Sequence, residues 1–427
     1  MLAVCFWIGA GSSALADPPL LSNSPLAPNP PVTANPTLTT DSPITRDSPN
    51  SVDWFIADQI TYDNNLYRLP TYLNVTTVAG PSARREDGYN STTLGGNGRW
   101  FSNSQTFGFD IRADENRFLH NDALNNLSGK GDLAWDWRLA SLWSGQVGVS
   151  YYRGLANFAD TGYYARDVVQ RYDYFGNIRY QVGPHLAIYG GVIGADTKQT
   201  AVPEQIYDFH SKAGNAGIEL ASNSQNTLTF DYRYTDATFP QNFVLNGEPF
   251  NSNYREDTER VLLKYVFSAA TELDVSAGYL KRDYPESNFG TFSGDIWKAA
   301  LQWQPTDNLQ WVLTSWRQLT AYIEAESDYF VSNGVAIAPT WIAADTLNLS
   351  LGVARESHDY INSSPSALTF ATRHDRVTTE QARIVYTPTS SLTFKFTFNF
   401  EQRDSNLTRF QYNDLVAIAG VTYMIRP

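Results

Sequence analysis

The chain has 427 residues, of which 42% are hydrophobic, 18% charged and 14% aromatic. The charged fraction lies below the roughly 25% of an average soluble domain, and a chain so rich in aromatic residues is not intrinsically disordered. The formal net charge of −13 argues against a nucleic-acid partner, which requires a basic surface. The single cysteine excludes an internal disulfide and a thiolate metal site.

The first 50 residues combine a targeting pattern with a tether. Residues 1–16 hold an apolar stretch and then small residues that end in Ala14-Leu15-Ala16, a pattern that signal peptidase cleaves. We therefore expect a signal peptide over residues 1–16. Residues 17–50 carry nine prolines among Ser, Thr and Asn, a composition that favours an extended periplasmic linker. This linker is either a plain spacer or an arm that docks on periplasmic export proteins.

No later segment is a candidate membrane helix. The longest uncharged run of interest, residues 329–344, contains Pro339 and is shorter than the ~20 residues needed to span a bilayer. A secreted chain without such helices can still cross a membrane as a closed β-barrel.

From residue 51 onward, apolar and polar residues alternate in segments of about ten residues, which is typical of transmembrane strands. In residues 392–403, Leu and Phe occupy the even positions as far as Phe400, and Thr, Lys, Asn, Glu and Arg occupy the odd positions. The same split recurs in residues 107–114, 133–138, 172–180, 228–234, 261–267 and 297–303. One face of each strand therefore suits lipid and the other suits water.

The connections between these segments alternate between short and long. Short turns are predicted at 101–105, 139–142, 182–185, 221–226, 269–272, 305–308, 343–346 and 388–391, with longer polar loops between them. Short periplasmic turns and long outer loops are typical of an outer-membrane barrel, and soluble sandwiches or propellers do not predict this alternation.

We therefore expect residues 51–427 to form an all-β, transmembrane antiparallel β-barrel. Eight turns and nine loops predict 18 strands, although weak segments at 309–322 and 329–342 leave 16 possible. In the first of these, Ser315 and Arg317 continue an apolar face, which indicates a bulge or the edge of the membrane.

Two further residue groups carry expectations about the barrel wall. Aromatic residues at strand ends are expected to form the girdles at the two membrane interfaces; they are Trp100, Phe118, Trp143, Tyr151, Tyr279, Tyr284, Trp303 and Tyr423. The cluster Gly95-Gly96-Asn97-Gly98 falls within a strand, where we expect it to relieve crowding or permit a bend.

A resemblance to a known family begins at Tyr62-Asp63-Asn64-Asn65-Leu66-Tyr67-Arg68-Leu69-Pro70. This stretch resembles the D-N-L-F-R-L signature near the start of EpsL-type outer-membrane β-barrel proteins, a group of β-barrel porins encoded with exopolysaccharide biosynthesis and export genes. The resemblance continues through Arg85-Glu86-Asp87-Gly88-Tyr89 to Trp143-Ser144-Gly145. It is specific over residues 51–155 and only architectural afterwards. Such barrels usually end in an aromatic residue, whereas this chain ends in Ile425-Arg426-Pro427, so the boundary of the last strand stays open.

Alternation predicts that a set of charged side chains points into the barrel and lines its pore. The basic members are Arg112, Arg138, Arg179, Arg233, Lys264, Lys298, Arg383, Lys395 and Arg403. The acidic members are Asp110, Asp136, Asp173, Asp231, Glu219 and Glu401. Such charges either line a water-filled channel and orient ions and polar sugars, or pair with one another across strands and only keep the interior hydrated.

Little in the sequence indicates catalysis. The five histidines, which all fall in predicted turns or loops, are His120, His185, His210, His358 and His374. No Ser-x-His spacing accompanies them, so we expect no catalytic residue, metal or cofactor, and no enzyme.

The expected protein lies in the outer membrane of a Gram-negative bacterium, in contact with outer-membrane lipid. The resemblance implies a passive pore that aids export of a secreted exopolysaccharide. Three alternatives remain open: a general or solute-selective porin for small hydrophilic molecules, a barrel enzyme that modifies lipid or polysaccharide, and a plugged scaffold or adhesin.

Overall fold

The computed structural model describes residues 50–160, 162–223, 226–245, 248–285, 291–324, 327–361 and 373–425. The expected signal peptide and the expected linker as far as residue 49 lie outside these ranges, so both stay predictions. In the described part of the chain, the helices are α1 (Val75–Val78) and short 3₁₀ segments at 122–124, 158–160, 202–207 and 408–410. None of these helices has the length and apolarity needed to cross a membrane.

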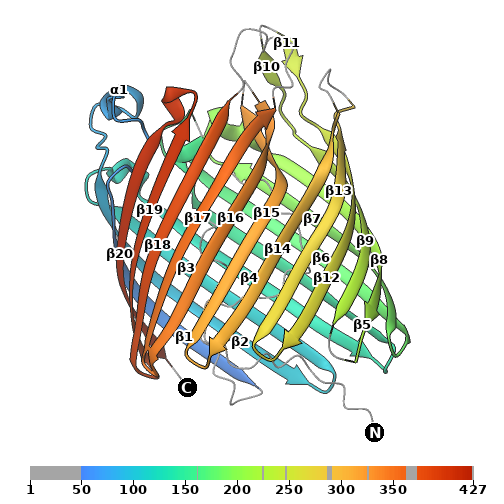
Figure 1. Ribbon diagram of the computed structural model, residues 1–427. Helices are drawn as coiled ribbons and strands as arrows, with labels where there is room; N and C mark the ends of the chain where they lie inside the picture. Colours follow the sequence, from blue (N-terminus) through green and yellow to red (C-terminus); the bar gives the residue numbers. More distant parts are fainter. Residues whose placement is uncertain are drawn as a thin grey trace.

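Strands built from the described residues form one 18-stranded antiparallel sheet that closes into a barrel (Figure 1). The first half comprises β1 (Ser51–Asp63), β2 (Asp87–Ser102), β3 (Gln105–Phe118), β4 (Asn126–Leu139), β5 (Trp143–Leu155), β6 (Val168–Gly183), β7 (Leu186–Gln199), β8 (Phe209–Ala221) and β9 (Thr227–Thr238). The second half comprises β12 (Tyr254–Ser268), β13 (Thr271–Asp283), β14 (Phe292–Thr306), β15 (Leu309–Glu324), β16 (Ser327–Ala344), β17 (Leu347–Ile361), β18 (His374–Thr389), β19 (Leu392–Ser405) and β20 (Tyr412–Ile425). A separate hairpin of β10 (Phe243–Leu245) and β11 (Glu248–Phe250) lies in the connection between β9 and β12.

The barrel closes where β1 pairs with β20, in a register that runs from Trp54↔Ile425 to Asp63↔Val416. The expected all-β barrel and the count of 18 strands are thereby confirmed, and the alternative of 16 strands is wrong. The two weak segments form β15 and β16, and β20 extends as far as Ile425.

All eight predicted turns fall between consecutive strands and, in their described residues, lie on the lower rim in Figure 1, where β1 also begins and β20 ends. At the turn between β2 and β3, Asn103 adopts a φ of 55°, a left-handed conformation that Asn tolerates well. The longer connections, in the part that the structure describes, lie on the upper rim. One of them departs from the expectation, because only residues 325 and 326 separate β15 from β16.

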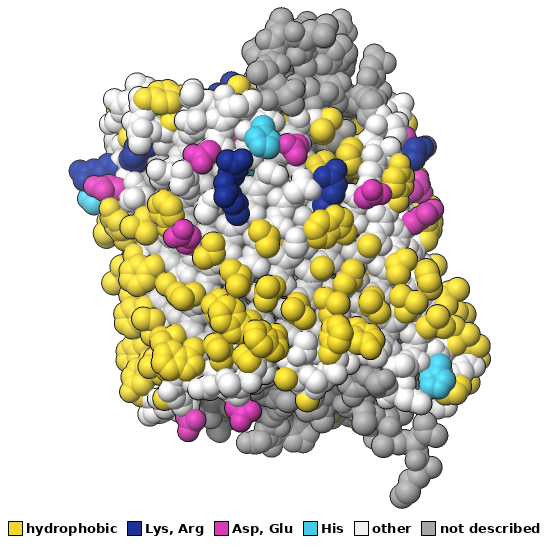
Figure 2. Space-filling view, viewed as in Figure 1, with side chains coloured by type: hydrophobic (Ala, Val, Ile, Leu, Met, Phe, Trp, Pro, Cys, Tyr) yellow, Lys and Arg dark blue, Asp and Glu magenta, His cyan; other side chains and the backbone are white. Residues whose placement is uncertain are grey.

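Side chains alternate between the two faces of the wall, as the sequence pattern predicts. Large apolar residues stay exposed on the outer face, and Figure 2 shows a broad hydrophobic band over the lower part of the strands, with charged side chains above it. Arg317 lies on the outer face in the upper half of β15, where its guanidinium donates to the Asp295 carbonyl and to Asn333. The β14–β15 register is continuous from Trp297↔Arg317 to Trp303↔Trp311, so this end of the apolar face marks the membrane edge and not a bulge.

The expectation of aromatic girdles holds for most but not all of the named residues. Exposed outer-face members are Trp100, Trp143, Tyr279, Trp303 and Tyr423, and Tyr151 packs on the outer-face residue Tyr172. Phe118 and Tyr284 were wrongly assigned to the girdles, because both are buried in apolar clusters. Phe118 has the same even-numbered parity as Asp110, which already places it on the inner face.

The glycine cluster in β2 permits close packing of neighbouring aromatic rings, as expected. A Cβ added to Gly95 would lie 2.3 Å from Cζ of Phe55 and 2.9 Å from the carbonyl oxygen of Ile111. One of these contacts is with backbone, which cannot move aside without disturbing the sheet.

We therefore predict that Gly95→Ala lowers the free energy of unfolding by about 1–3 kcal/mol, a usual cost of overpacking. Gly176→Ala is the matched control, because its added Cβ would be 3.9 Å from the nearest atom, in Val147. Urea unfolding of the barrel refolded in lipid, followed by tryptophan fluorescence, measures both variants. Equal stability of the two would show that the Phe55 ring over Gly95 does not require glycine.

Candidate functional site

The strand register places all fifteen charged residues of the predicted set on the inner face of the barrel. In β9, for example, Phe230, Tyr232 and Tyr234 are 48%, 45% and 39% exposed on the outer face, whereas Asp231 and Arg233 between them are 5% and 9% exposed. Inner and outer positions thus follow directly from the pleat of each strand. That these side chains line an open pore stays a prediction.

A deeply buried ionic contact of the inner wall joins Asp231 to Arg260, 2.5 Å apart. Asp231 also accepts hydrogen bonds from the Tyr189 hydroxyl at 2.8 Å and from the Asn215 amide at 3.2 Å. Removing a charge from water is costly unless its partners satisfy it, and this carboxylate has three. The cluster therefore fixes the inner wall across β7, β8, β9 and β12.

Several other predicted residues are paired with neighbours on the same wall. The pairs are Arg179 with Glu219 at 2.7 Å, Asp173 with Arg171 at 2.7 Å, Asp110 with Lys130 at 3.4 Å, Arg112 with Asp114 at 3.6 Å, and Lys264 with Glu272. The interpretation that charges pair across strands thus holds for Arg179, Asp110 and Lys264, whereas Asp173 and Arg112 pair with a residue of their own strand.

The remaining predicted residues lie at other heights along the inner wall of the barrel. Asp136 and Arg138 are exposed near the lower rim, and Lys395 is exposed near the start of β19. Lys298 is half-buried between Ser276 and Trp316 in the register. Others contact neighbouring strands: Arg383 lies opposite Ser350 and Thr397, and Glu401 accepts a hydrogen bond from Tyr412.

At the upper rim, three loops fold together into what we call the mouth cap, made of the described residues of 64–86, 119–125 and 156–167. Its buried apolar core contains Leu66, Tyr67, Leu69, Val75, Leu124 and Phe158. This core packs on Tyr89 of β2 and Phe118 of β3. Both rings lie on the inner face, so the core of the mouth cap packs against the inside of the barrel at its upper rim.

Arg68 attaches the first of these loops to the barrel wall. Its guanidinium lies 2.9 Å from Asp63 at the end of β1 and 2.9 Å from Asp414 of β20. Burial opposes the charge on Arg68, but the two carboxylates outweigh it and raise the pKa of the guanidinium. Nearby, burial raises the pKa of the Tyr67 hydroxyl to about 12, so this group stays neutral. The pair of strands that closes the barrel, β1 and β20, thus also holds the cap.

Buried carboxylates join the loops to one another. Asp87 accepts hydrogen bonds from the backbone N–H and the side-chain amide of Asn121, at 2.8 and 2.9 Å. Asp167 accepts from the backbone N–H groups of Thr200 and Ala201, both at 2.8 Å. The cap is therefore continuous with the loop between β7 and β8.

The side chain of Arg403 links the cap to β19, which lies beyond the β1–β20 pair that closes the barrel. Arg403 of β19 is buried, and its Nη1 donates to the carbonyl oxygen of Ala159 at 3.0 Å. Ala159 belongs to the loop between β5 and β6, and 244 residues separate the two groups along the chain. The third loop thus reaches inward across the strands from β5 back to β19. Arg403, expected to line the pore, holds the cap.

Sequence reasoning missed several inner-face charges, notably Lys130, Asp132, Arg171 and Arg260. Each of them lies on the same face of its strand as a residue that the alternation had already predicted to point inward. Lys130 and Asp132 share the even-numbered face of β4 with Asp136, and Arg260 shares the even-numbered face of β12 with Lys264. Extending each alternation toward the upper rim would have found them.

The histidines are distributed differently from the expectation. His210, His358 and His374 lie in β8, β17 and β18, not in turns or loops. His358 is buried on the inner wall with its Nε2 3.2 Å from Glu356. Among the described residues, no group of three or more His, Cys, Asp or Glu could hold a metal ion.

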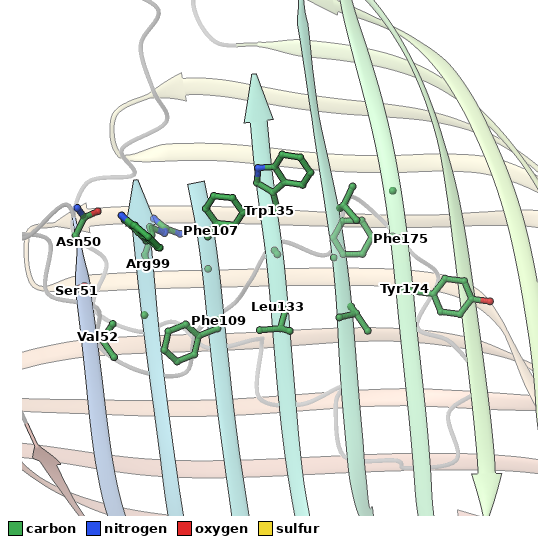
Figure 3. Close-up of a pocket in the computed structure, with 18 of the residues that line it drawn as sticks. Asn50, Ser51, Val52, Arg99, Phe107, Phe109, Leu133, Trp135, Tyr174 and Phe175 are labelled. Carbon is green, nitrogen blue, oxygen red and sulfur yellow. The ribbon is translucent and has the colours of Figure 1, made fainter. Parts of the chain in front are cut away.

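An apolar groove of about 970 Å³ lies on the outer face of the first strands. Its lining includes Phe107, Phe109, Leu133 and Trp135, and Figure 3 shows these side chains on neighbouring strands. The Phe107 and Trp135 rings stack 5.8 Å apart. This surface belongs to the hydrophobic band and suits lipid chains, not a polar solute.

The chain is similar to a porin family model over part of its length and to several solved structures at low identity. The family model "Putative beta-barrel porin 2" matches residues 263–424. No curated protein matches the sequence. Solved structures that align with 88% of this chain include OccK2 (OpdF) of Pseudomonas aeruginosa, at 12% identity over 98% of that chain and a TM-score of 0.46. A BenF-like porin from Pseudomonas fluorescens Pf-5 aligns at 11% identity over 99% of its chain, with a TM-score of 0.47. OccAB3 of Acinetobacter baumannii aligns at 9% identity over 99% of its chain, with a TM-score of 0.46.

The closed sheet leaves no free edge in the bilayer, and its outer band suits lipid. With the porin model that matches residues 263–424, these features identify the protein as a β-barrel of the Gram-negative outer membrane that is similar to porins over that range.

Proposed function

We propose that the protein is a passive channel for small hydrophilic solutes, whose outer mouth is narrowed by the mouth cap. The observation that carries this proposal is the contact between Arg403 and Ala159, which holds a loop inside the mouth. A barrel of 18 strands is wide enough for an aqueous channel. A loop that reaches inward across this mouth reduces the size of solute that can pass.

The inner wall supports passage of polar molecules. Its ion pairs, such as Arg179 with Glu219, keep charged groups at the lumen surface and so keep it hydrated. Passage by diffusion requires no catalytic residue, metal or cofactor.

Export of an exopolysaccharide is the second candidate, and it rests on the resemblance over residues 51–155. A capped mouth favours small solutes over a wide hydrated polymer, which is why we place the solute channel first. Deletion of the gene would separate the two: polymer that accumulates in the periplasm supports export, and an unchanged surface polymer supports the solute channel.

We predict that the purified barrel conducts ions. In planar bilayers it should give stable conductance steps, and in liposome swelling it should admit monosaccharides faster than larger oligosaccharides because the cap limits size. A silent barrel in both assays would contradict the channel and would favour the scaffold or enzyme alternatives.

A second prediction concerns the link that Arg403 makes. Arg403→Ala removes a hydrogen bond to a charged donor, worth about 1.5–3 kcal/mol, so hydrogen exchange of residues 156–167 should become roughly tenfold faster or more. Swelling with the larger oligosaccharides should also become faster, because the third loop is released.

Lys395→Gln is the control for this variant, since Lys395 lies on the same inner face of β19 but near the opposite rim. Both proteins are first checked for folding by heat-modifiable gel mobility. If Arg403→Ala folds but leaves loop exchange and the size limit unchanged, the cap is not held by this contact.

A further inference from the structure

Two rows of charged side chains run side by side on the inner wall of β3 to β6. In the upper row, the register places Arg112 opposite Lys130, Lys130 opposite Tyr152, and Tyr152 opposite Arg171. In the row below, the register runs through Asp110, Asp132, Ser150 and Asp173. Adjacent strands lie about 4.8 Å apart and two residues span about 7 Å. The wall therefore presents a cationic row with an acidic row directly beside it.

The charges of these rows are matched, yet several of them stay accessible. Lys130 lies 3.4 Å from Asp110 and 4.0 Å from Asp132, and Arg171 makes two contacts of 2.7 Å with Asp173. The side chain of Asp173 is nevertheless 39% exposed. Fixed donors and fixed acceptors thus face the lumen together, with little net charge between them.

An aromatic ring interrupts the cationic row. Tyr152 is 39% exposed, and a Cβ added to Gly154 would lie 2.3 Å from its hydroxyl oxygen, so the ring lies over the glycine and along the wall. The opposite face of the ring remains available to the lumen. Below both rows, Phe175 lies in the same way over Gly148, where an added Cβ would be 2.4 Å from the ring. The polar rows are therefore bordered by flat aromatic surfaces.

We propose that this wall is a binding site for a neutral saccharide, an inference that rests on the proposed function. A sugar hydroxyl both donates and accepts hydrogen bonds, and the alternating Lys130, Asp132 and Asp173 offer both kinds of partner. Hydrogen bonds to charged groups are the stronger ones, and the C–H face of a pyranose ring packs on an aromatic face such as that of Tyr152. A few polar groups set beside an aromatic surface are typical of small-molecule sites.

The matched charges decide the class of ligand. An anion would meet cations that already have carboxylate partners, together with the exposed carboxylate of Asp173. A cation would meet Arg112, which is 40% exposed, and Arg171. A neutral, hydroxyl-rich solute is repelled neither by the carboxylate of Asp173 nor by the guanidinium groups of Arg112 and Arg171. The site lies on the strands below the mouth cap, so a solute that has passed the cap reaches it next.

The test is interruption of the ionic current through single channels in planar bilayers by maltose, with glucuronate as the charged comparison. The wild-type barrel should show concentration-dependent interruptions with maltose and fewer with glucuronate. Tyr152→Leu should shorten the interruptions about tenfold, whereas Tyr152→Phe, which keeps the ring, should retain most of the effect.

Tyr151→Leu is the matched control, since this tyrosine is the next residue of the same strand and lies on the outer face. For the polar rows, Lys130→Gln should weaken the interruptions, whereas Lys298→Gln, which removes an inner-face cation from β14, should leave them unchanged.

The possible negative results differ in which proposal they overturn. A barrel that gives no conductance overturns the proposed channel. A conducting barrel that maltose does not interrupt, or whose interruptions are equal in Tyr152→Leu and Tyr151→Leu, overturns the saccharide site and leaves the channel standing. Stronger interruption by glucuronate than by maltose would also overturn it, because the ligand would then be an anion.

Discussion

The structure depends on one constraint: inside a bilayer, every backbone N–H and C=O group must find its partner within the protein. The pairing of β1 with β20 meets this constraint, because it removes the free edges that an open sheet would present to lipid. With all neighbours antiparallel, an even number of strands returns the chain to the rim where it began. Short turns then collect on that rim and the loops on the other, which leaves the loops free to build a mouth cap.

Closure of the sheet also exposes the two faces of each strand to different surroundings, lipid outside and water inside. Alternate residues face lipid and the lumen, so one short sequence must satisfy both. Phe230 and Tyr232 meet the first requirement, and Asp231 between them meets the second through its contact with Arg260. Charges on the inner wall are mostly paired with a neighbour, because a lone charge beside the low-dielectric wall is costly. On β3 to β6 this pairing leaves a polar surface of nearly balanced charge, which is the basis of the saccharide site that we propose.

The mouth cap is stabilised by other interactions than the barrel wall. Its apolar core and its buried carboxylates hold loops that carry no periodic pattern. Its most distant contact, from Arg403 to Ala159, joins residues that are far apart along the chain. Such contacts require the closed barrel, which brings the upper ends of the strands together, so the size limit that we propose for the channel depends on that closure.

The sequence by itself determined the all-β barrel, its turns and the face of most strand residues, and it favoured 18 strands while it left 16 possible. Those properties follow from a period of two, which is local: the pleat alone decides that Asp110, Arg112 and Phe118 share a face. Only the tertiary structure decided which inner-face groups meet. The offset between strands sets Tyr152 between Lys130 and Arg171, and no local pattern encodes that offset. The mouth cap was likewise beyond the sequence, because loop packing depends on contacts between segments whose separation in space only the closed sheet defines.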